Sequence, residues 1–337
     1  MLVTKPLISV VIATRNRGGS VVDAVESVLE NEKGSKEDVP AFEILVIDQS
    51  MQDDCQRLMQ KYENEPRVIY QRSHTVGLAR ARNIAIHQAK GELIAITDDD
   101  CVVSKNWLTA IQQAFAQHPE AVIFFGNALP GAYDSSAGFI PSYCREKAKI
   151  ISSVLDKNDV DGLGACMAMR KSVWQEFNGF DEMLGVGGVL KSSSEGDLVL
   201  KALKNDYRVG ETPNISVVHN GFRTWEQGVS LIFRYWYGTG AMYGKHLKLY
   251  PLSTSWLLIL LAWRWAFGHS RVADSIGPNT RKTFRLYAFI SGLFKGLWLT
   301  VERETGHFKK AVLATEPTGD RHMAGYITCH AHKQADG

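Results

Sequence analysis

Three adjacent carboxylates, Asp98, Asp99 and Asp100, follow an apolar run at residues 93–96 that is typical of a short buried strand. Three neighbouring anions repel one another, and a bound cation relieves that repulsion. Mg²⁺ and Mn²⁺ prefer oxygen ligands, often one or two carboxylates together with substrate phosphates. The residues therefore predict a metal–diphosphate site at the carboxyl end of a strand, where open α/β sheets bind ligands. A solvated acidic turn that caps the helix beginning near Trp107 is the alternative interpretation.

A second group of acids lies at Glu195 and Asp197, where an apolar helical pattern begins and runs through Leu203. Acids in the first turn of a helix are also favoured by the helix dipole, so a purely structural interpretation stays open for both. His219 ends a β-branched run that begins at residue 215. A lone histidine is more often structural than functional, but its position at a strand end favours a site.

The elements that must position these residues alternate along the first half of the chain. Strands are predicted at residues 8–13, 42–48, 68–70, 93–97 and 121–125, and helices at 21–29, 77–89 and 107–115. This alternation predicts an α/β fold with a mostly parallel, twisted sheet flanked by helices. A strand at 162–170, a short helix near Val173, the helix from Ser194 and a closing pair of strands at 207–213 and 215–219 follow. The Gly- and Ser-rich segment 184–194 predicts a mobile loop beside the site.

Two common nucleotide-binding motifs are missing from the sequence. No G-x-G-x-x-G follows the first strand, which argues against a dinucleotide-binding Rossmann domain. No G-x-x-x-x-G-K-[ST] is present, which argues against a P-loop NTPase.

Four sequence blocks carry a resemblance to a known family. They are Ile8-Ser-Val-Val-Ile-Ala-Thr-Arg-Asn-Arg17, Ile44-Leu-Val-Ile-Asp48, Gly77-Leu-Ala-Arg-Ala-Arg-Asn83 and Thr97-Asp-Asp-Asp100. In this order and spacing they resemble the nucleotide-binding half of the family 2 glycosyltransferases, which are inverting enzymes of the GT-A fold. The resemblance implies a GT-A domain over residues 1–222, with a nucleotide-binding half at 1–127 and an acceptor half at 128–222.

The resemblance also implies a role for each candidate residue. The nucleotide sugar would be bound by Thr14, Asn16, Asp48, Arg82, Asp98 and Asp99. Within that set Thr14 would contact the base, and Asp48 would accept a hydrogen bond from a uracil N–H. Asp100 would bind Mn²⁺ or Mg²⁺, with His219 as a further metal ligand. A turn or helix-capping role for Asp48 and a solvent-facing position for Arg82 are the plainer alternatives.

The chain departs from the family pattern at two places. Asp48-Gln-Ser stands where the family usually has Asp-Asp-Gly-Ser, so one acid is missing beside the base site. Ser194-Glu195-Gly196-Asp197-Leu198 stands where the family has Glu-Asp-x-Asp-Leu. The helix phase aligns Glu195 with the middle acid, the catalytic base of inverting members, and Asp197 with the last acid. Glutamate can abstract the same proton, although its side chain is one methylene longer.

Composition sets only broad limits. The 337 residues are 45% hydrophobic and 22% charged, as in folded proteins, and 38 basic against 36 acidic residues give a net charge of +2. Five scattered cysteines lack metal-ligand spacing, so a reducing, cytoplasmic compartment is expected. No signal peptide is visible at the N-terminus.

Residues 223–310 predict a basic and aromatic helical extension, followed by a flexible tail at 311–337. From residue 227 to residue 301 the only acid is Asp274, against nine lysines and arginines. The apolar runs are short and interrupted by Arg264 and Arg285, so they do not predict a membrane span. Two interpretations stay open: helices that lie in the headgroup region of an anionic membrane, through residues 252–300 at its inner face, or helices packed on the catalytic domain or a partner subunit. No nucleic-acid-binding module is recognisable, so nucleic acid is not an expected partner.

Together these features predict an inverting, metal-dependent glycosyltransferase. It would move a sugar from a nucleoside-diphosphate sugar, expected to be a UDP-sugar, to a hydroxyl of a glycan, lipid-linked or surface-polysaccharide acceptor. Two other functions remain open at this stage. One is a sugar-nucleotide nucleotidyltransferase, which shares the α/β sheet and the metal. The other is a non-catalytic subunit that binds nucleotide sugar or membrane.

Overall fold

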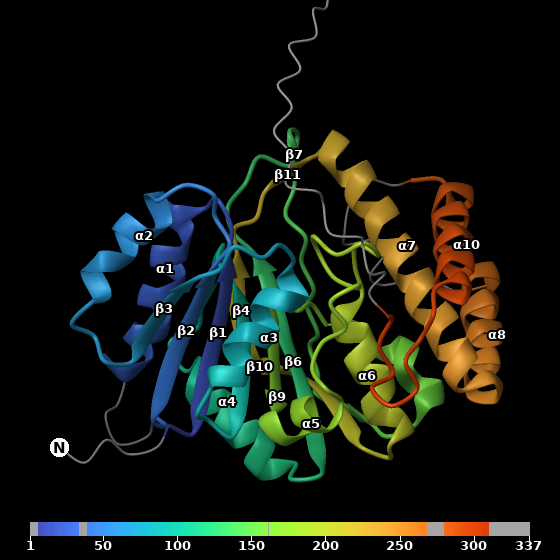
Figure 1. Ribbon diagram of the computed structural model, residues 1–337, viewed down its shortest axis with the longest axis horizontal. Helices are drawn as coiled ribbons and strands as arrows, with labels where there is room; N and C mark the ends of the chain where they lie inside the picture. The colour runs from blue at the N-terminus through green and yellow to red at the C-terminus, as the bar shows by residue number, and fades with distance from the viewer. Residues whose placement is uncertain (1–5, 34–38, 161, 268–279, 310–337) are drawn as a thin grey trace, which may run out of the picture.

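A single large sheet runs through the centre of the protein (Figure 1). The computed structural model describes residues 6–33, 39–160, 162–267 and 280–309. The sheet order is β3-β2-β1-β4-β9-β6-β10-β5, with β8 paired to β10. These strands are β1 (Ile8–Thr14), β2 (Phe42–Asp48), β3 (Val68–Arg72), β4 (Leu93–Asp98), β5 (Cys101–Val103), β6 (Ala121–Pro130), β8 (Lys149–Ile151), β9 (Cys166–Arg170) and β10 (Arg208–His219). β7 (Gly138–Phe139) and β11 (Arg223–Thr224) form a separate small ribbon.

The sheet is parallel in its first half and mixed in its second. β3, β2, β1 and β4 pair in parallel, as the alternating pattern predicted. β9 then enters antiparallel between β4 and β6, and both β5 and β8 run antiparallel to β10. β6 and β10 again pair in parallel. The α/β class and the mostly parallel character of the sheet are confirmed, with the difference that antiparallel strands make the second half mixed.

The predicted pair of closing strands is one continuous strand, β10. Its pairing with β6 shifts register between Glu211 and Ser216. Pro213 lies within this shift and has no backbone N–H to donate to the neighbouring strand. The local irregularity accommodates the proline, and the strand continues beyond it. His219 is the last residue of β10 and pairs with Cys101 of β5. The strand therefore delivers His219 beside the acids that follow β4.

Helices cover both faces of the sheet and create two apolar cores. One face is packed by α1 (Gly18–Leu29), α2 (Asp54–Met59) and α4 (Trp107–Gln117), and the other by α3 (Leu78–Gln88), α5 (Lys171–Glu176) and α6 (Ser194–Lys204). In α1 the fully buried Val21, Val25 and Val28 recur at helical spacing and face the β1 side chains. Each such side chain removed from water contributes about 1.5–3 kcal/mol, which fixes the helix against the strand whose end carries Thr14.

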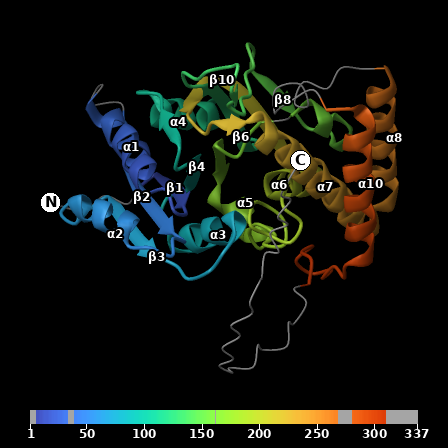
Figure 2. The same ribbon diagram turned by 90° about the horizontal axis from the view of Figure 1, so that it is seen from above.

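Three long helices form a separate layer at the opposite end of the sheet from α1 and α2 (Figure 2). They are α7 (Trp225–Leu249), α8 (Pro251–Phe267) and α10 (Lys282–Trp298). α7 and α10 approach closely because glycines face each other: a Cβ added at Gly240 would lie 2.0 Å from the Phe289 carbonyl oxygen, and one at Gly292 would lie 1.9 Å from that of Tyr237. Among the described residues, no helix combines the length and the hydropathy that a transmembrane span requires.

The segment after α10 returns to the α/β part of the fold. Val301 and Phe308 form a β-bridge, and the buried Phe308 donates its backbone N–H to Asp181 at 2.9 Å. The chain after Arg303 is polar, which by itself would predict fraying, but these contacts hold residues 304–309 in place. The predicted flexible tail at 311–337 lies outside the described residues.

The loop at 184–194 has no helix or strand before α6, as predicted, but backbone hydrogen bonds hold it on both sides. Gly185 donates its N–H to Ser192, and Val186 accepts from Leu78 at the start of α3. Leu184 and Leu190 are fully buried and anchor the loop. Its mobility stays a prediction.

Candidate active site

Three acids occupy the turn that leaves β4, and each has a different set of neighbours. Asp98 is the last residue of the strand, and its Oδ1 accepts from Arg82 at 3.1 Å. Asp99 is buried, whereas Asp100 lies opposite His219. The chain turns from β4 into β5 at this point, so successive side chains leave in different directions. Adjacency in sequence has therefore produced three distinct environments.

Asp99 joins the end of β1 to the acidic turn. Thr14 donates its hydroxyl to Asp99 Oδ2 at 2.7 Å, and Arg17 Nη1 contacts Asp99 Oδ1 at 3.1 Å and Asp100 Oδ2 at 2.5 Å. Burial raises the pKa of Asp99 to about 6, because desolvation outweighs the stabilising pull of Arg17. Thr14 and Asp99 are both buried, and their hydrogen bond links the ends of β1 and β4 at this edge of the sheet.

Asp100 and His219 are the best placed pair for a divalent metal. His219 Nε2 lies 3.3 Å from Asp100 Oδ1, and Nδ1 lies 2.7 Å from the Pro141 carbonyl. A carbonyl only accepts, so Nδ1 donates to Pro141 and Nε2 is the nitrogen that faces Asp100. Burial alone would lower the pKa of His219, but Asp100 outweighs it and raises the pKa, which favours a protonated ring next to the bare carboxylate. The neutral ring would offer its Nε2 lone pair to a metal ion bound between the two side chains. A ring held in this way is typical of metal-ligating histidines. Burial raises the pKa of Asp100, but His219 and Arg17 outweigh it and lower the value to about 2.

Cys101 is the third side chain of this group. Its sulfur lies within 4.8 Å of the Asp100 and His219 ligand atoms, and the residue is buried. Oxygen and nitrogen donors suit Mn²⁺ and Mg²⁺ better than a thiol does, and burial raises the pKa of this thiol. The carboxylate and the imidazole therefore fit the expected hard cation, with Cys101 packed behind them.

Arg82 connects the acidic turn to α6. The guanidinium is almost entirely buried, forms an ion pair with Glu195 and with Asp98, and donates to the Gly164 carbonyl at 3.2 Å. Burial alone would raise the pKa of Glu195, but the charge of Arg82 outweighs this effect and lowers the pKa. The carboxylate is therefore ionised at neutral pH. A solvent-facing Arg82 is therefore excluded. The arginine holds Glu195 in the same small region as the acids at the end of β4.

The expected base-recognition residues lie beyond the acidic turn. Asp48 is fully buried at the end of β2 and accepts from Ser50 N at 2.8 Å and Tyr70 Oη at 2.6 Å. Asn16 has a left-handed backbone (φ 57°), and its N–H donates to Ser50 Oγ at 2.7 Å. Both residues hold the loop after β2 in place. A uracil contact by Asp48 would require Tyr70 to release the carboxylate.

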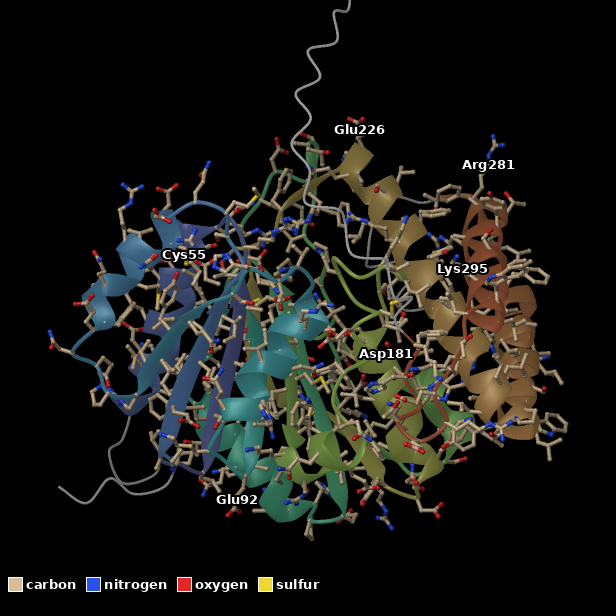
Figure 3. The ribbon with its side chains drawn as sticks, in the orientation of Figure 1. Cys55, Glu92, Asp181, Glu226, Arg281 and Lys295 are labelled. Carbon is tan, nitrogen blue, oxygen red and sulfur yellow. The ribbon has the colours of Figure 1, made fainter. Side chains whose placement is uncertain are left out.

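Asp197 lies away from the acidic turn. It has no exposed surface, and its Oδ1 accepts from Lys245 and His246, both at 2.8 Å. Lys245 also pairs with Asp181 at 2.8 Å, in the interior between α6 and α7 (Figure 3). Two residues along the helix from Glu195, Asp197 therefore faces the opposite way. Its catalytic role stays a prediction, although a positioning role suits it better, because Asp197 has no exposed surface and lies outside the lining of the cavity that Glu195 lines.

A cavity of about 560 Å³ extends from the acidic turn toward the C-terminal helices. Asp98, Arg82, Glu195 and His219 line one end of it, and residues of α7 and α8, including Trp236 and Arg264, line the other. Thr14, Asp48, Asp99 and Asp100 lie outside its lining. The cavity thus begins where Glu195 lies and continues away from the expected base site.

Sequence reasoning overlooked two arginines at this site. Arg17 is the cation that contacts Asp99 and Asp100. Its position just after the first predicted strand was the sequence feature that could have identified it. Arg223 lines the cavity four residues after His219. Burial and the positive charges of Arg17 and Arg234 lower its pKa. Only the fold brings Arg223 and Arg17 together, so the sequence carried no signal for that pair.

A comparison with protein families now becomes informative. The model of "Glycosyl transferase family 2" matches residues 9–177 of this chain, which is half of its length. The chain belongs to glycosyl transferase family 2. The matched region includes the acid triplet and Arg82 and ends before Glu195 and His219.

Curated relatives of this family 2 protein match only part of its length. The glycosyltransferase GlyG of Streptococcus pneumoniae is 34% identical over 136 residues, covering 39% of this chain and 42% of GlyG. The putative teichuronic acid biosynthesis glycosyltransferase TuaG of Bacillus subtilis is 30% identical over 131 residues, covering 37% and 48%. The chain thus spans less than half the length of these relatives.

Solved structures share the fold over most of the chain. TarS residues 1–349 of Staphylococcus aureus, in complex with UDP-GlcNAc, aligns with a TM-score of 0.57 at 17% identity over 85% of this chain and 81% of that one. The mannosyltransferase PcManGT of Pyrobaculum calidifontis, in complex with GDP-Man and Mn²⁺, gives 0.51 at 17% identity over 87% and 88%. At this identity the similarity establishes the GT-A-like fold, which extends beyond the matched family region.

Proposed function

We propose that this protein transfers a sugar from a nucleoside-diphosphate sugar to an acceptor hydroxyl in one displacement that inverts the anomeric carbon. Family membership and the GT-A-like fold support the donor class. The arrangement of Glu195 beside the acidic turn supports the reaction type. One carboxylate base and no covalent nucleophile are what a single displacement needs.

Glu195 is the proposed general base. It lines the cavity, and its carboxylate is ionised because Arg82 lowers its pKa. Ser194 donates its hydroxyl to Glu195 Oε2 at 2.9 Å, while Arg82 engages Oε1, so the carboxylate is fixed in orientation. The Glu195 carboxylate would accept the proton of the acceptor hydroxyl as that oxygen attacks. A bond then forms between the acceptor oxygen and the anomeric carbon, and the bond to the diphosphate breaks.

Asp100 and His219 are the residues that would hold Mn²⁺ or Mg²⁺. When bound there, the ion supplies Lewis-acid neutralisation of the charge that develops on the leaving diphosphate. His219 is suited to this because the Pro141 carbonyl fixes its tautomer and leaves Nε2 toward Asp100. Asp98, at the end of β4 and held by Arg82, is placed to contact the donor between the metal ligands and Glu195.

Arg17 and Arg223 are proposed to face the diphosphate from the protein side. Arg17 is partly exposed and already contacts the outer oxygen of Asp100. The pKa of Arg223 is lowered by burial and by its cationic neighbours, which marks a local excess of positive charge beside Asp100. An anion placed between these two guanidinium groups would relieve their mutual repulsion.

The donor base and the acceptor are less closely defined. A UDP-sugar is the first donor to test, since the structurally similar TarS was captured with UDP-GlcNAc. The acceptor we propose is a glycan, lipid-linked or part of a surface polysaccharide. Relatives named for poly(ribitol-phosphate) glycosylation and teichuronic acid biosynthesis support this class.

The single observation that carries this proposal is the Arg82 bridge. One buried guanidinium joins Asp98, at the end of β4, to Glu195, at the start of α6. These residues are 97 positions apart in sequence, as their numbers show. The bridge brings Glu195, the proposed general base, and Asp98, at the proposed diphosphate-binding edge, to the same end of one cavity.

Calorimetry with UDP, GDP, dTDP and CDP, each with and without Mn²⁺, tests the donor site first. We expect one nucleotide to bind, and its affinity to fall at least about tenfold without metal. Equal nucleotide affinity with and without Mn²⁺ would show that Asp100 and His219 do not form the proposed metal site. If a folded protein bound none of the four nucleotides, with or without an anionic vesicle or glycan present, the proposed function would be wrong.

A further inference from the structure

Two neighbouring helices of the C-terminal layer each expose a set of large apolar side chains. On α8 these are Leu252, Trp256, Ile259 and Trp263, and on α10 they are Tyr287, Ile290, Phe294 and Trp298. We call this set the α8–α10 face. Its members are 40–84% exposed, although apolar side chains of this size are normally buried.

The spacing shows that each helix presents one apolar stripe outward. On α8 the exposed residues recur at intervals of four, three and four, and α10 repeats nearly the same pattern. The inward stripes are buried separately, with Leu257 on α8 and Ala288 and Phe289 on α10 packed against the core that α7 shares. These helices are therefore apolar on two sides, and packing within the protein uses only one of them.

The position of the α8–α10 face suits contact with a large surface. α8 and α10 lie side by side at the end of the molecule farthest from α1 and α2, and both views show nothing outside them among the described residues (Figures 1 and 2). The face therefore forms the outer boundary of the helical layer rather than a groove that a small ligand would fill.

The charged side chains of the two helices themselves are basic, and the one acid that pairs with α8, Asp159, lies in the neighbouring 3-10 turn and is matched by Arg264. Neither α8 nor α10 contains an aspartate or glutamate, whereas Arg281 and Lys282 are exposed at the start of α10 and Lys295 lies near its end. Arg281 projects outward from the end of that helix (Figure 3). The nearest acids in sequence, Glu302 and Glu304, come after α10 has ended. The face is thus an apolar stripe with a basic rim.

We propose that the α8–α10 face binds the surface of an anionic membrane, with both helices parallel to the bilayer. Tryptophan and tyrosine prefer the headgroup boundary, apolar stripes enter the first part of the acyl region, and basic residues attract anionic lipids. Charge complementarity favours a lipid surface over an uncharged apolar partner.

This placement has a consequence for the cavity. Leu261 and Arg264 of α8 line its far end, and Arg264 is held there by Asp159 at 2.6 Å. Trp263 is the neighbour of Arg264 and belongs to the α8–α10 face. Membrane binding would therefore bring the α8 end of the cavity to the lipid surface, where a lipid-linked acceptor would enter. The binding itself does not depend on the proposed transfer reaction.

Vesicle co-sedimentation of the full chain tests the proposal. One set of vesicles is pure phosphatidylcholine, and the other contains about a third phosphatidylglycerol, a content chosen to give a surface potential that draws in basic residues. We expect binding to the anionic vesicles only, weakened at least about tenfold in 0.5 M NaCl because salt screens exposed charges. A double substitution, Trp256→Ser with Trp263→Ser, should lower the vesicle affinity at least about tenfold, since two large apolar contacts are lost.

The matched control substitutes exposed apolar residues on the other side of the molecule, Met51→Ser with Leu58→Ser. It should bind vesicles like the unaltered protein, and circular dichroism should show all variants folded. Equal binding to both kinds of vesicle, or no binding to either, would overturn the proposal. A dimer in light scattering that the tryptophan variant converts to a monomer, without vesicle binding, would assign the face to self-association instead.

Discussion

Two acidic clusters lie on either side of α6, and they differ in how their charge is balanced. At the sheet edge, four carboxylates (Asp98, Asp99, Asp100 and Glu195) share two guanidinium groups, those of Arg17 and Arg82. In the interior, two carboxylates, Asp181 and Asp197, share two ammonium groups, those of Lys201 and Lys245. Among these ion-paired groups the carboxylates outnumber the cations by two at the edge, where Arg223 and His219 also lie close to Asp100, whereas the numbers are equal in the interior.

The pKa values follow this difference. Burial raises the pKa of Asp98 and Asp99 at the edge, where nearby acids add to the effect. In the interior, burial alone would raise the pKa of Asp197, but Lys245, Lys201 and His246 hold it well below its usual range. An unmatched cluster gains from binding a cation, whereas a matched one gains nothing. The comparison therefore supports the proposal that the edge binds ligand and the interior supports the fold.

The largest expected effect comes from Glu195→Gln. Removing a general base lowers transfer by about 10²–10⁴-fold, while the shape of the side chain is kept. Transfer should be measured from nucleoside diphosphate release, and donor binding should change little. The control is Glu182→Gln, another acid in an arginine pair, here with Arg80. Transfer retained within threefold would mean that another group is the base.

Lys245→Met should affect stability instead. It leaves Asp181 and Asp197 with too little positive charge in a fully buried place, which costs roughly 3–5 kcal/mol of unfolding free energy. Urea unfolding measures this, with Lys295→Met as the control on α10. A loss below about 1 kcal/mol would show that the interior cluster is not the balanced support described above.

Asp100→Asn is expected to weaken metal-dependent nucleotide binding, by a smaller factor than Glu195→Gln lowers transfer. Loss of one carboxylate ligand should weaken Mn²⁺-dependent nucleotide binding by about 10–100-fold. His219→Gln should act in the same direction by a similar factor, and Asp134→Asn, an exposed acid remote from β4, should not act at all. If both site variants kept the full metal dependence, the metal would have to bind elsewhere.

The smallest effect is the pH dependence of the interior cluster. Burial lowers the pKa of His246 to about 4, although Asp197 pulls it upward, and the unfolded value is about 6.5. Between pH 4 and pH 6.5, roughly, His246 is protonated in the unfolded chain but stays neutral in the folded protein. The unfolding free energy should therefore fall as the pH drops from about 6.5 to about 4.

The measurement is the melting temperature at pH 7.5 and pH 5, compared for the unaltered protein and His246→Gln. The substitution should reduce the difference between the two melting temperatures. His87→Gln, at an exposed helix end, should leave that difference unchanged. An equal slope in all three proteins would show that His246 titrates normally.

Much of the nucleotide-binding half could be predicted from the sequence, because its strands and helices carry strong local patterns. The β-branched run of β1 and the apolar run of β4 fix which residues come at strand ends, and parallel pairing brings such ends to one edge. Hence Thr14 and Asp98 were expected together, and register pairs the neighbouring Ala13 with Asp98. The C-terminal helices were likewise expected from composition.

The direction in which side chains point was decided by the tertiary structure. Glu195 and Asp197 share one helix turn, yet one lines the cavity and the other is sealed against Lys245, which arrives from α7. No local pattern distinguishes them, because burial depends on a helix that lies some 50 residues further along the chain, as the numbers of Asp197 and Lys245 show. The sequence by itself determined which acids were present and where strands end. Long-range packing determined which of these acids kept an unmatched charge, because only packing decides whether a cation from a distant part of the chain lies next to a given acid.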